Sequence, residues 1–189
     1  LIRSLSEKSP TELPLLLFIA RKNNDTTILP ILQQQGASEL LDDTQFQQLK
    51  TRLKLGDQSA LLQFKAFVLS ENDYREQALE LAFSQLEISE AKQWMGELKN
   101  SPNAERYLLL AVGAMKEKPL LPWVVKQMQT PELARIAGKV FSQLSGQDLR
   151  KNEWILTDGS MDEEWLSLEG DEELDWPDVI QIKKAMNYE

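Results

Sequence analysis

Cysteine and histidine are absent from all 189 residues of the sequence. Their absence excludes disulfide bonds, thiolate nucleophiles, the usual zinc ligands and every catalytic base or triad built on histidine. Long hydrophobic runs are also missing. The longest apolar stretches, Leu15 to Ala20 and Leu108 to Met115, are far shorter than the roughly 20 residues of a membrane-spanning helix. We therefore expect no cofactor, no metal, no catalytic residue and no membrane partner.

A cysteine-free chain suits a reducing compartment, so the sequence favours a cytoplasmic location. Basic residues are scarce only near the C-terminus: residues 1–152 hold 19 Lys and Arg against 18 Asp and Glu, whereas residues 153–189 hold 2 against 12. The acidic end accounts for the net charge of −9. Because an acidic chain repels phosphate backbones, we expect no nucleic-acid partner, and a protein with a basic surface would be attracted.

Helix-start signals recur at a fixed interval. Asp43, Asn72, Ser101 and Thr130 are spaced 29 residues apart, and each offers a side-chain oxygen that can cap a helix. Ser101 and Thr130 also precede a proline, which is favourable at the first helical position. The spacing predicts the first helices of four consecutive helix pairs.

Apolar residues follow each signal at helical spacing. They are Phe46, Leu49 and Leu53; Ala78, Ala82 and Leu86; Leu108, Ala111 and Met115; and Ile136, Val140, Phe141 and Leu144. The same interval aligns Leu62, Ala91 and Leu120, and Trp94 with Trp123, in second helices. A further pair is predicted from Leu13 to Ala20 and from Thr27 to Gln35. Strand signals are scarce. The pattern predicts an all-α fold, a short α-solenoid of helix pairs over residues 1–150, with an irregular helical bundle as the alternative.

The stretch from Tyr107 to Leu149 carries a resemblance to HEAT-like repeat proteins. Its motifs are Leu109-Leu110-Ala111-Val112-Gly113, Leu121-Pro122-Trp123, Ala137-Gly138-Lys139-Val140-Phe141 and Ser145-Gly146-Gln147-Asp148-Leu149, and Leu174-Asp175-Trp176-Pro177-Asp178-Val179 extends the likeness downstream. More narrowly, they resemble an uncharacterised bacterial HEAT-repeat family similar to proteins encoded near type VI secretion components. The resemblance implies a structural role for these residues, with Ala137 and Gly138 allowing close helix approach, and an accessory function in secretion. The usual HEAT period of about 40 residues is not matched.

Residues 151–189 form an acidic extension that we expect to end in a short helix. Trp154, Trp165 and Trp176 recur in it every 11 residues, and each follows an acid. One interpretation is a flexible ribbon that binds a basic groove of a partner, with these tryptophans and Asp162, Glu163 and Glu164 as the binding residues. The other is that the extension lies across the last helix pair and covers its end. Because the chain starts at Leu1 with no leader, we expect it to be part of a longer protein.

A calcium loop is a weak third interpretation of the extension. Asp158, Ser160, Asp162, Glu164 and Glu169 fall at ligand positions of an EF-hand loop, but Glu163 stands where a glycine is needed. The sequence therefore favours a non-enzymatic protein-binding scaffold or adaptor, which recognises a protein or peptide with either the concave face of the solenoid or the acidic extension. A metal-dependent or carboxylate-based hydrolase and a structural spacer are the alternatives.

Overall fold

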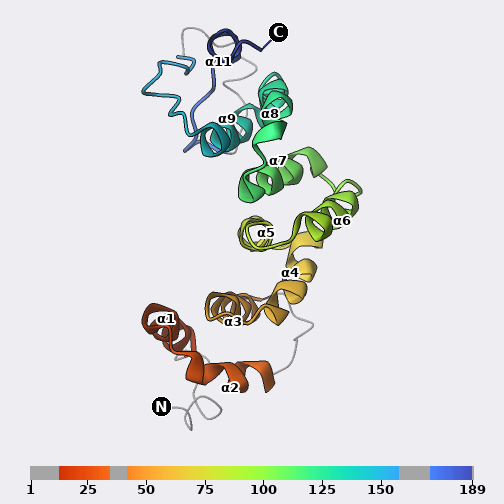
Figure 1. Cartoon of the computed structure of the whole chain (residues 1–189), viewed down its shortest axis with the longest axis vertical. Helices are drawn as coiled ribbons and strands as arrows, with labels where there is room; N and C mark the ends of the chain where they lie inside the picture. Colours follow the sequence, from red (N-terminus) through yellow and green to blue (C-terminus); the bar gives the residue numbers. More distant parts are fainter. Residues whose placement is uncertain (1–12, 35–41, 158–170, 189) are drawn as a thin grey trace. The chain divides into compact units, whose positions relative to one another are not determined.

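The computed structural model describes residues 13–34, 42–157 and 171–188, and Figure 1 shows its helices along the chain. Within these ranges the regular structure is helical and contains no strand; Ile155 and Pro177 form an isolated antiparallel bridge. The predicted all-α class is confirmed. No helix in the described ranges is both long and apolar enough to cross a membrane.

Two compact units make up the chain, Leu1–Trp94 and Met95–Glu189, here called the N-terminal unit and the C-terminal unit. The predicted extension after residue 150 lies within the C-terminal unit. Helices of the N-terminal unit are α1 (Leu13–Asn23), the 3-10 helix η2 (Thr26–Ile28), α2 (Leu29–Gln34), α3 (Asp43–Lys54), α4 (Ser59–Leu69) and α5 (Arg75–Phe83), and α6 (Ile88–Leu98) begins in it.

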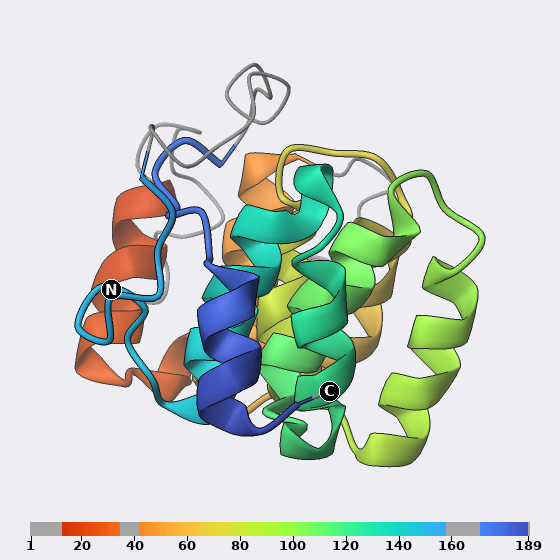
Figure 2. The ribbon, with the colours of Figure 1, turned by 90° about the horizontal axis from the view of Figure 1, so that it is seen from above.

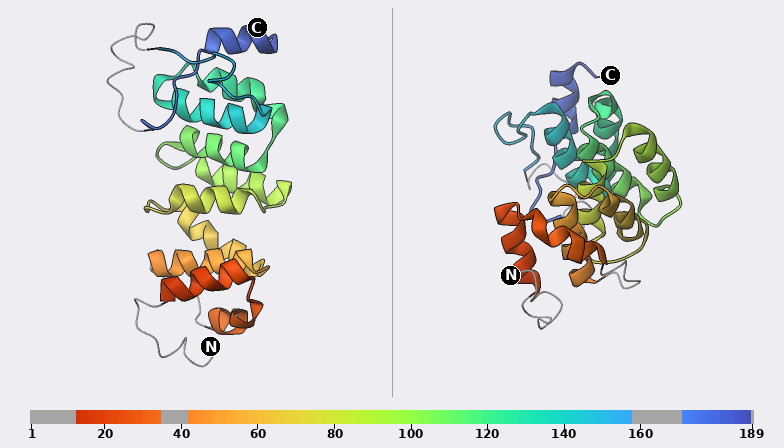
Figure 3. Two further views of the ribbon diagram at one scale, coloured as in Figure 1. Left: turned by 90° about the vertical axis from the view of Figure 1, so that its left-hand side faces the viewer. Right: turned by 60° about the horizontal axis from the view of Figure 1, so that its bottom comes forward.

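Helix α1 packs against α3, α3 against α4, and α4 against α5; the first of these contacts is visible in Figure 3. Aromatic rings fill the centre of the N-terminal unit. Phe46 stacks on Tyr74 with ring centroids 4.9 Å apart and meets Phe64 edge to face at 5.9 Å. Such aromatic pairs add stability beyond the apolar area that they bury. A second cluster joins α1 to α2: Leu17, Ala20, Ile28, Leu32 and Leu55.

The C-terminal unit contains α7 (Ala104–Met115), the 3-10 helix η3 (Lys118–Leu120), α8 (Leu121–Gln127), α9 (Pro131–Ser145) and α11 (Val179–Met186). Both α7 and α8 pack against α9. Helix α11 lies beside α8, as Figure 2 shows. The close approach of α7 and α9 occurs at Gly113, where an added Cβ would lie 3.2 Å from a methyl group of Val140.

The regular 29-residue period is not found in the structure. Helices α3, α5, α7 and α9 begin at Asp43, Arg75, Ala104 and Pro131, which are 32, 29 and 27 residues apart. Only the start of α9 follows its predicted cap directly.

Local hydrogen bonds explain these shifts. Asp42, and not Asp43, caps α3 by accepting from the Gln45 amide. Asn72 accepts from the amide of Tyr74 and so forms a turn before α5. Ser101 Oγ donates back to the Leu98 carbonyl, and the left-handed backbone of Asn103 delays α7.

Residues aligned by the predicted period also differ in environment. Ala91 is buried, whereas its predicted equivalents Leu62 and Leu120 are exposed. Trp94 is buried and meets Phe83 edge to face, whereas Trp123 is half-buried. Stacking of successive helix pairs into a solenoid therefore stays a prediction.

Candidate functional site

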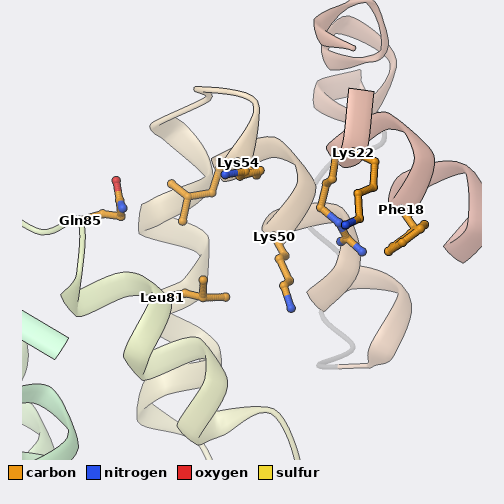
Figure 4. Close-up of a pocket in the computed structure, with 8 residues that line it drawn as sticks. Phe18, Lys22, Lys50, Lys54, Leu81 and Gln85 are labelled. Atoms are coloured by element: carbon orange, nitrogen blue, oxygen red, sulfur yellow. The ribbon is translucent and has the colours of Figure 1, made fainter. Parts of the chain in front are cut away.

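A cavity of about 680 Å³ opens on the N-terminal unit among α1, α3 and α5. Figure 4 shows Phe18 and Lys22 extending into it from α1, Lys50 and Lys54 from α3, and Leu81 and Gln85 from α5 and its end. Arg21 and Leu53 complete the described lining. We call this cavity the basic pocket.

The pocket lies where two helices fail to pack directly. Helices α3 and α5 both pack against α4, but among the described residues they are not in comparable contact with each other. In the C-terminal unit, by contrast, α7 and α9 pack closely against each other. Among the starts of α3, α5, α7 and α9, the interval between α3 and α5 is also the longest, because the Asn72 turn delays α5. The space left between α3 and α5 is the basic pocket.

Four cationic side chains line the pocket, and no carboxylate stands among its described lining residues. Lys22, Lys50 and Lys54 form no ion pair with any residue that the structure describes. Like charges gathered in one cavity repel one another, and this repulsion is relieved when an anion enters. The chain as a whole carries a net charge of −9, so the pocket is a local positive site on an acidic protein.

Hydrogen bonds to side chains of α3 hold Arg21 in place. Its Nη1 donates to Gln47 Oε1 at 3.0 Å and to Thr51 Oγ1 at 3.1 Å, so it ties α1 to α3. Burial lowers the pKa of the Arg21 guanidinium from its ordinary value, while nearby Asp43 opposes the shift. A guanidinium keeps its charge at every physiological pH. Arg21 is therefore a fixed positive charge at the wall of the pocket.

The pocket also has an apolar component. Lys22 Nζ lies 5.7 Å from the centroid of the Phe18 ring, and Lys50 Nζ lies 5.8 Å from that of Phe46. These cation–π contacts orient the ammonium groups without neutralising them. Phe18 is 49% exposed, and Leu81, on the other side of the lining in Figure 4, is half-buried. The pocket can thus hold an apolar group flanked by carboxylates.

Arg52, another basic residue of α3, has different surroundings from the lysines of the pocket. Arg52 is buried, and its Nε lies 2.8 Å from Asp57 Oδ2. Asp57 also accepts from Gln33 Nε2 at 3.0 Å and from Ser59 Oγ at 2.6 Å. Burial alone would raise the pKa of Asp57, but the hydrogen bonds from Ser59, Gln33 and Arg52 outweigh it and lower this pKa to about 2. The charge of Arg52 therefore stabilises the fold through an internal ion pair, whereas Lys50 and Lys54 line the pocket.

The predicted binding residues of the C-terminal extension are only partly described. Trp165, Asp162, Glu163 and Glu164 lie outside the described residues, as does the whole predicted calcium loop. Trp154 is half-buried and meets Phe141 edge to face at 6.3 Å. Trp176 is 7% exposed and lies under the Arg135 guanidinium, whose Cζ is 4.2 Å from the ring centroid. Both described tryptophans thus pack onto α9, as expected for an extension that covers the last helix pair.

Backbone hydrogen bonds also connect two segments of the extension. Leu156 donates its amide to the Trp176 carbonyl at 2.8 Å, and Asp178 donates to the Trp154 carbonyl at 2.9 Å. These bonds flank the Ile155–Pro177 bridge. Gly138 gives this segment room, because an added Cβ would lie 3.3 Å from Pro177 and 3.2 Å from Leu149. The close approach at Gly138 is therefore to Leu149 and to Pro177 of the extension, and not to another helix as expected.

Asp171 and Asp175 of the extension form ion pairs with arginines of the C-terminal unit. Arg106 Nη2 donates to Asp171 Oδ1 at 2.8 Å, and Arg150 donates to both oxygens of Asp175 at 2.6 Å. The Arg106 hydrogen bond lowers the pKa of Asp171 although burial opposes it. Over the described ranges, no three carboxylates lie close enough together to hold a metal ion.

Sequence reasoning missed the basic pocket because its cations come from separate helices. The available signals were the Arg21-Lys22 pair at the end of one helix and the four-residue spacing of Lys50 and Lys54 on another.

Comparison of the chain with protein-family models, curated proteins and solved structures found no match. The resemblance to HEAT-like repeat proteins stays a prediction, and the basic pocket is the site from which a function can be argued.

Proposed function

We propose that the chain is a non-enzymatic protein-binding module whose N-terminal unit recognises acidic segments of a partner. The observation that carries this proposal is the basic pocket: four cations around one apolar-walled cavity of about 680 Å³, with no described carboxylate lining it. This surface does not contain the candidate binding residues that the sequence singled out, which lie in the acidic extension and were expected to attract a basic partner.

The two components of the pocket have separate roles in this proposal. The lysines give selectivity for acidic segments and speed their approach, because electrostatic complementarity acts mainly on specificity and association rate. Each exposed charge pair contributes little alone, about 0.2 to 1 kcal/mol. Most of the affinity comes from burying an apolar side chain against Phe18 and Leu81. The bound segment is therefore both acidic and apolar.

The net charge of the chain limits the kind of anion. A protein with a net charge of −9 repels long polyanions such as nucleic acids at a distance. A short acidic peptide feels this repulsion less and reaches the local positive field of the pocket. Screening by salt acts over about 8 Å at physiological ionic strength, so binding weakens as salt is added.

The finer parts of the proposal concern architecture and cellular role. Direct packing of first helices, α1 on α3 and α7 on α9, supports a HEAT-like arrangement of helix pairs. An adaptor role in a bacterial secretion system is compatible with a peptide-binding pocket and stays a prediction from the sequence resemblance. The hydrolase and spacer alternatives have no observation of their own in the described ranges.

Binding of a labelled peptide tests the proposal. A fluorescent peptide that alternates glutamate with leucine is titrated with the protein, and its anisotropy is followed. We expect saturable binding that the double variant Lys50→Glu/Lys54→Glu weakens at least about tenfold, because two attractive contacts become repulsive. The matched control is Lys92→Glu/Lys99→Glu, which makes the same change of charge at two exposed lysines outside the pocket.

Equal loss of binding in the two double variants would mean that net charge alone is responsible, and the proposal would fail. A lysine–leucine peptide of the same length is the second control. If that basic peptide binds and the acidic one does not, the acidic extension is the recognition element instead.

A further inference from the structure

Helix α1 has two apolar faces. One face joins the core of the N-terminal unit through Leu17 and Ala20, which pack with residues of η2 and α2. The other carries Leu15, Phe18 and Ile19, which are 61%, 49% and 40% exposed. A helix that is apolar on both sides is normally covered on both sides. The second face therefore has the character of a binding surface.

This second face leads directly into the basic pocket. Leu15, Phe18, Ile19 and Lys22 follow the spacing i, i+3, i+4 and i+7, so they form one stripe on α1 about 10 Å long. Phe18 belongs to the stripe and also lines the pocket. The apolar stripe and the pocket cations are thus continuous parts of one surface on the N-terminal unit.

The surface offers side chains and no backbone partners. Stripe and pocket residues from α1 and α3 stand on helices, whose backbone groups are already hydrogen-bonded within the helix. In the part of the chain that the structure describes there is no sheet edge to which an extended peptide could add as a strand. A bound segment gains no backbone partner from these helices, and an α-helix satisfies most of its backbone groups internally.

We propose that the occupant is an acidic amphipathic α-helix of a partner protein. Its apolar face packs on Leu15, Phe18 and Ile19, and its carboxylates face Lys22, Lys50 and Lys54. Charge complementarity with the pocket selects this occupant over a neutral or basic helix. The inference rests on the proposed function, since it specifies the conformation and the residue pattern of the acidic segment.

Three peptides of 14 residues and identical net charge separate the inference from the proposed function. The first places leucine at i, i+3, i+4 and i+7 among glutamates and alanines; the second has the same composition without a stripe; the third is the first with a central proline that breaks the helix. We expect the first to bind at least about tenfold more tightly than the other two and to gain helicity in difference circular dichroism.

The protein variants are matched in the same way. Leu15→Ser removes a stripe residue that is 61% exposed, and Leu62→Ser removes a leucine of α4 that is 63% exposed. We expect Leu15→Ser to weaken binding of the amphipathic peptide about five- to tenfold, and Leu62→Ser to leave it unchanged. If Leu15→Ser alters the circular dichroism spectrum of the protein, Ile19→Ser takes its place.

Each other result has a defined meaning. If all three peptides bind equally and Lys50→Glu/Lys54→Glu abolishes their binding, the helix inference is overturned and the proposed function stands. If none of them binds, both are overturned. If light scattering shows dimers that Leu15→Ser separates, a second copy of the chain covers the stripe and the inference is wrong.

Discussion

Charged side chains have different surroundings in the two units. In the N-terminal unit, Lys22, Lys50 and Lys54 gather around one cavity and make no ion pair with the described residues. In the C-terminal unit, Asp171 and Asp175 each receive two hydrogen bonds from an arginine. A charge that already forms an ion pair within its own fold gains less interaction energy from a binding partner than a charge in a cavity without such a pair.

Aromatic side chains follow the same division. Trp176 is buried beneath Arg135, whereas Phe18 is half exposed under Lys22. Cation–π pairs therefore occur in both units, and the pair of Lys22 and Phe18 lines a cavity whose lysines make no ion pair with the described residues. The comparison supports the proposal that recognition occurs in the N-terminal unit, because the described tryptophans and acids of the C-terminal extension make contacts within their own unit.

The largest effect is expected when the packing of the extension is broken. Trp176→Ala should lower the free energy of unfolding by about 3 to 5 kcal/mol, because a buried indole and its contact with Arg135 are lost. Urea unfolding followed by circular dichroism measures this change. Ile180→Ala, at a side chain 74% exposed on α11, is the control and should change little. A loss below about 1 kcal/mol for Trp176→Ala would show that the extension is not a structural part of the unit.

A second prediction concerns the buried ion pair of Arg52 and Asp57. The pKa of Asp57 is lowered to about 2 from 3.8, so its ionised form stabilises the fold above pH 3.8 and loses this effect as the pH falls toward 2. The shift corresponds to about 2 kcal/mol. The stability difference between the wild type and Asp57→Asn should therefore shrink by about 2 kcal/mol from pH 5 to pH 2. Urea midpoints at several pH values measure it, and a difference that does not vary with pH would contradict the assigned network.

How far local sequence decides structure is clear from the starts of α7 and α9. Thr130 and Pro131 fixed the start of α9 correctly, and Gly146 ends that helix with a φ of 74°. Ser101 and Pro102 carry the same signal, yet α7 begins at Ala104. Ser101 is close enough to the end of α6 to bond back to Leu98, and that competing bond is not visible in a capping pattern.

The candidate site depends on how separate helices pack, which local sequence patterns do not predict. Periodicity places Phe46, Leu49 and Leu53 on the buried face of α3, and all three are buried. Which cations gather on the other side depends on the packing of α1 and on the gap between α3 and α5. Neither follows from helical spacing. The candidate binding residues named from the sequence were therefore those of the extension, whose charges and tryptophans lie within one short stretch of the chain.

A smaller effect is expected at two glycines of the C-terminal unit, and it has opposite signs. Gly138→Ala should destabilise the fold by about 1 kcal/mol, because its Cβ would crowd Pro177, which the bonds flanking the Ile155–Pro177 bridge hold in place. Gly96→Ala in α6 should stabilise by about 0.5 to 1 kcal/mol, since nothing lies within 4 Å of the added methyl group and alanine favours the helix. Thermal unfolding compares the two. If Gly138→Ala also stabilised the protein, the close contact with the extension would be refuted.

The smallest expected difference is between the two arginines that bind the extension. The side chains of Arg106 and Asp171 are 24% and 14% exposed, whereas that of Arg150 is 70% exposed. Arg106→Gln should lower stability by about 1 to 2 kcal/mol, because it leaves a shielded carboxylate without its charged donor. Arg150→Gln should have less effect, since water replaces the lost donor and salt screens the pair. Urea unfolding at low and high salt measures both variants. If Arg150→Gln lowered stability more than Arg106→Gln, the exposure of an ion pair would not decide how strongly it holds the extension. The difference between the two units could then not be explained by the pairing of their charges.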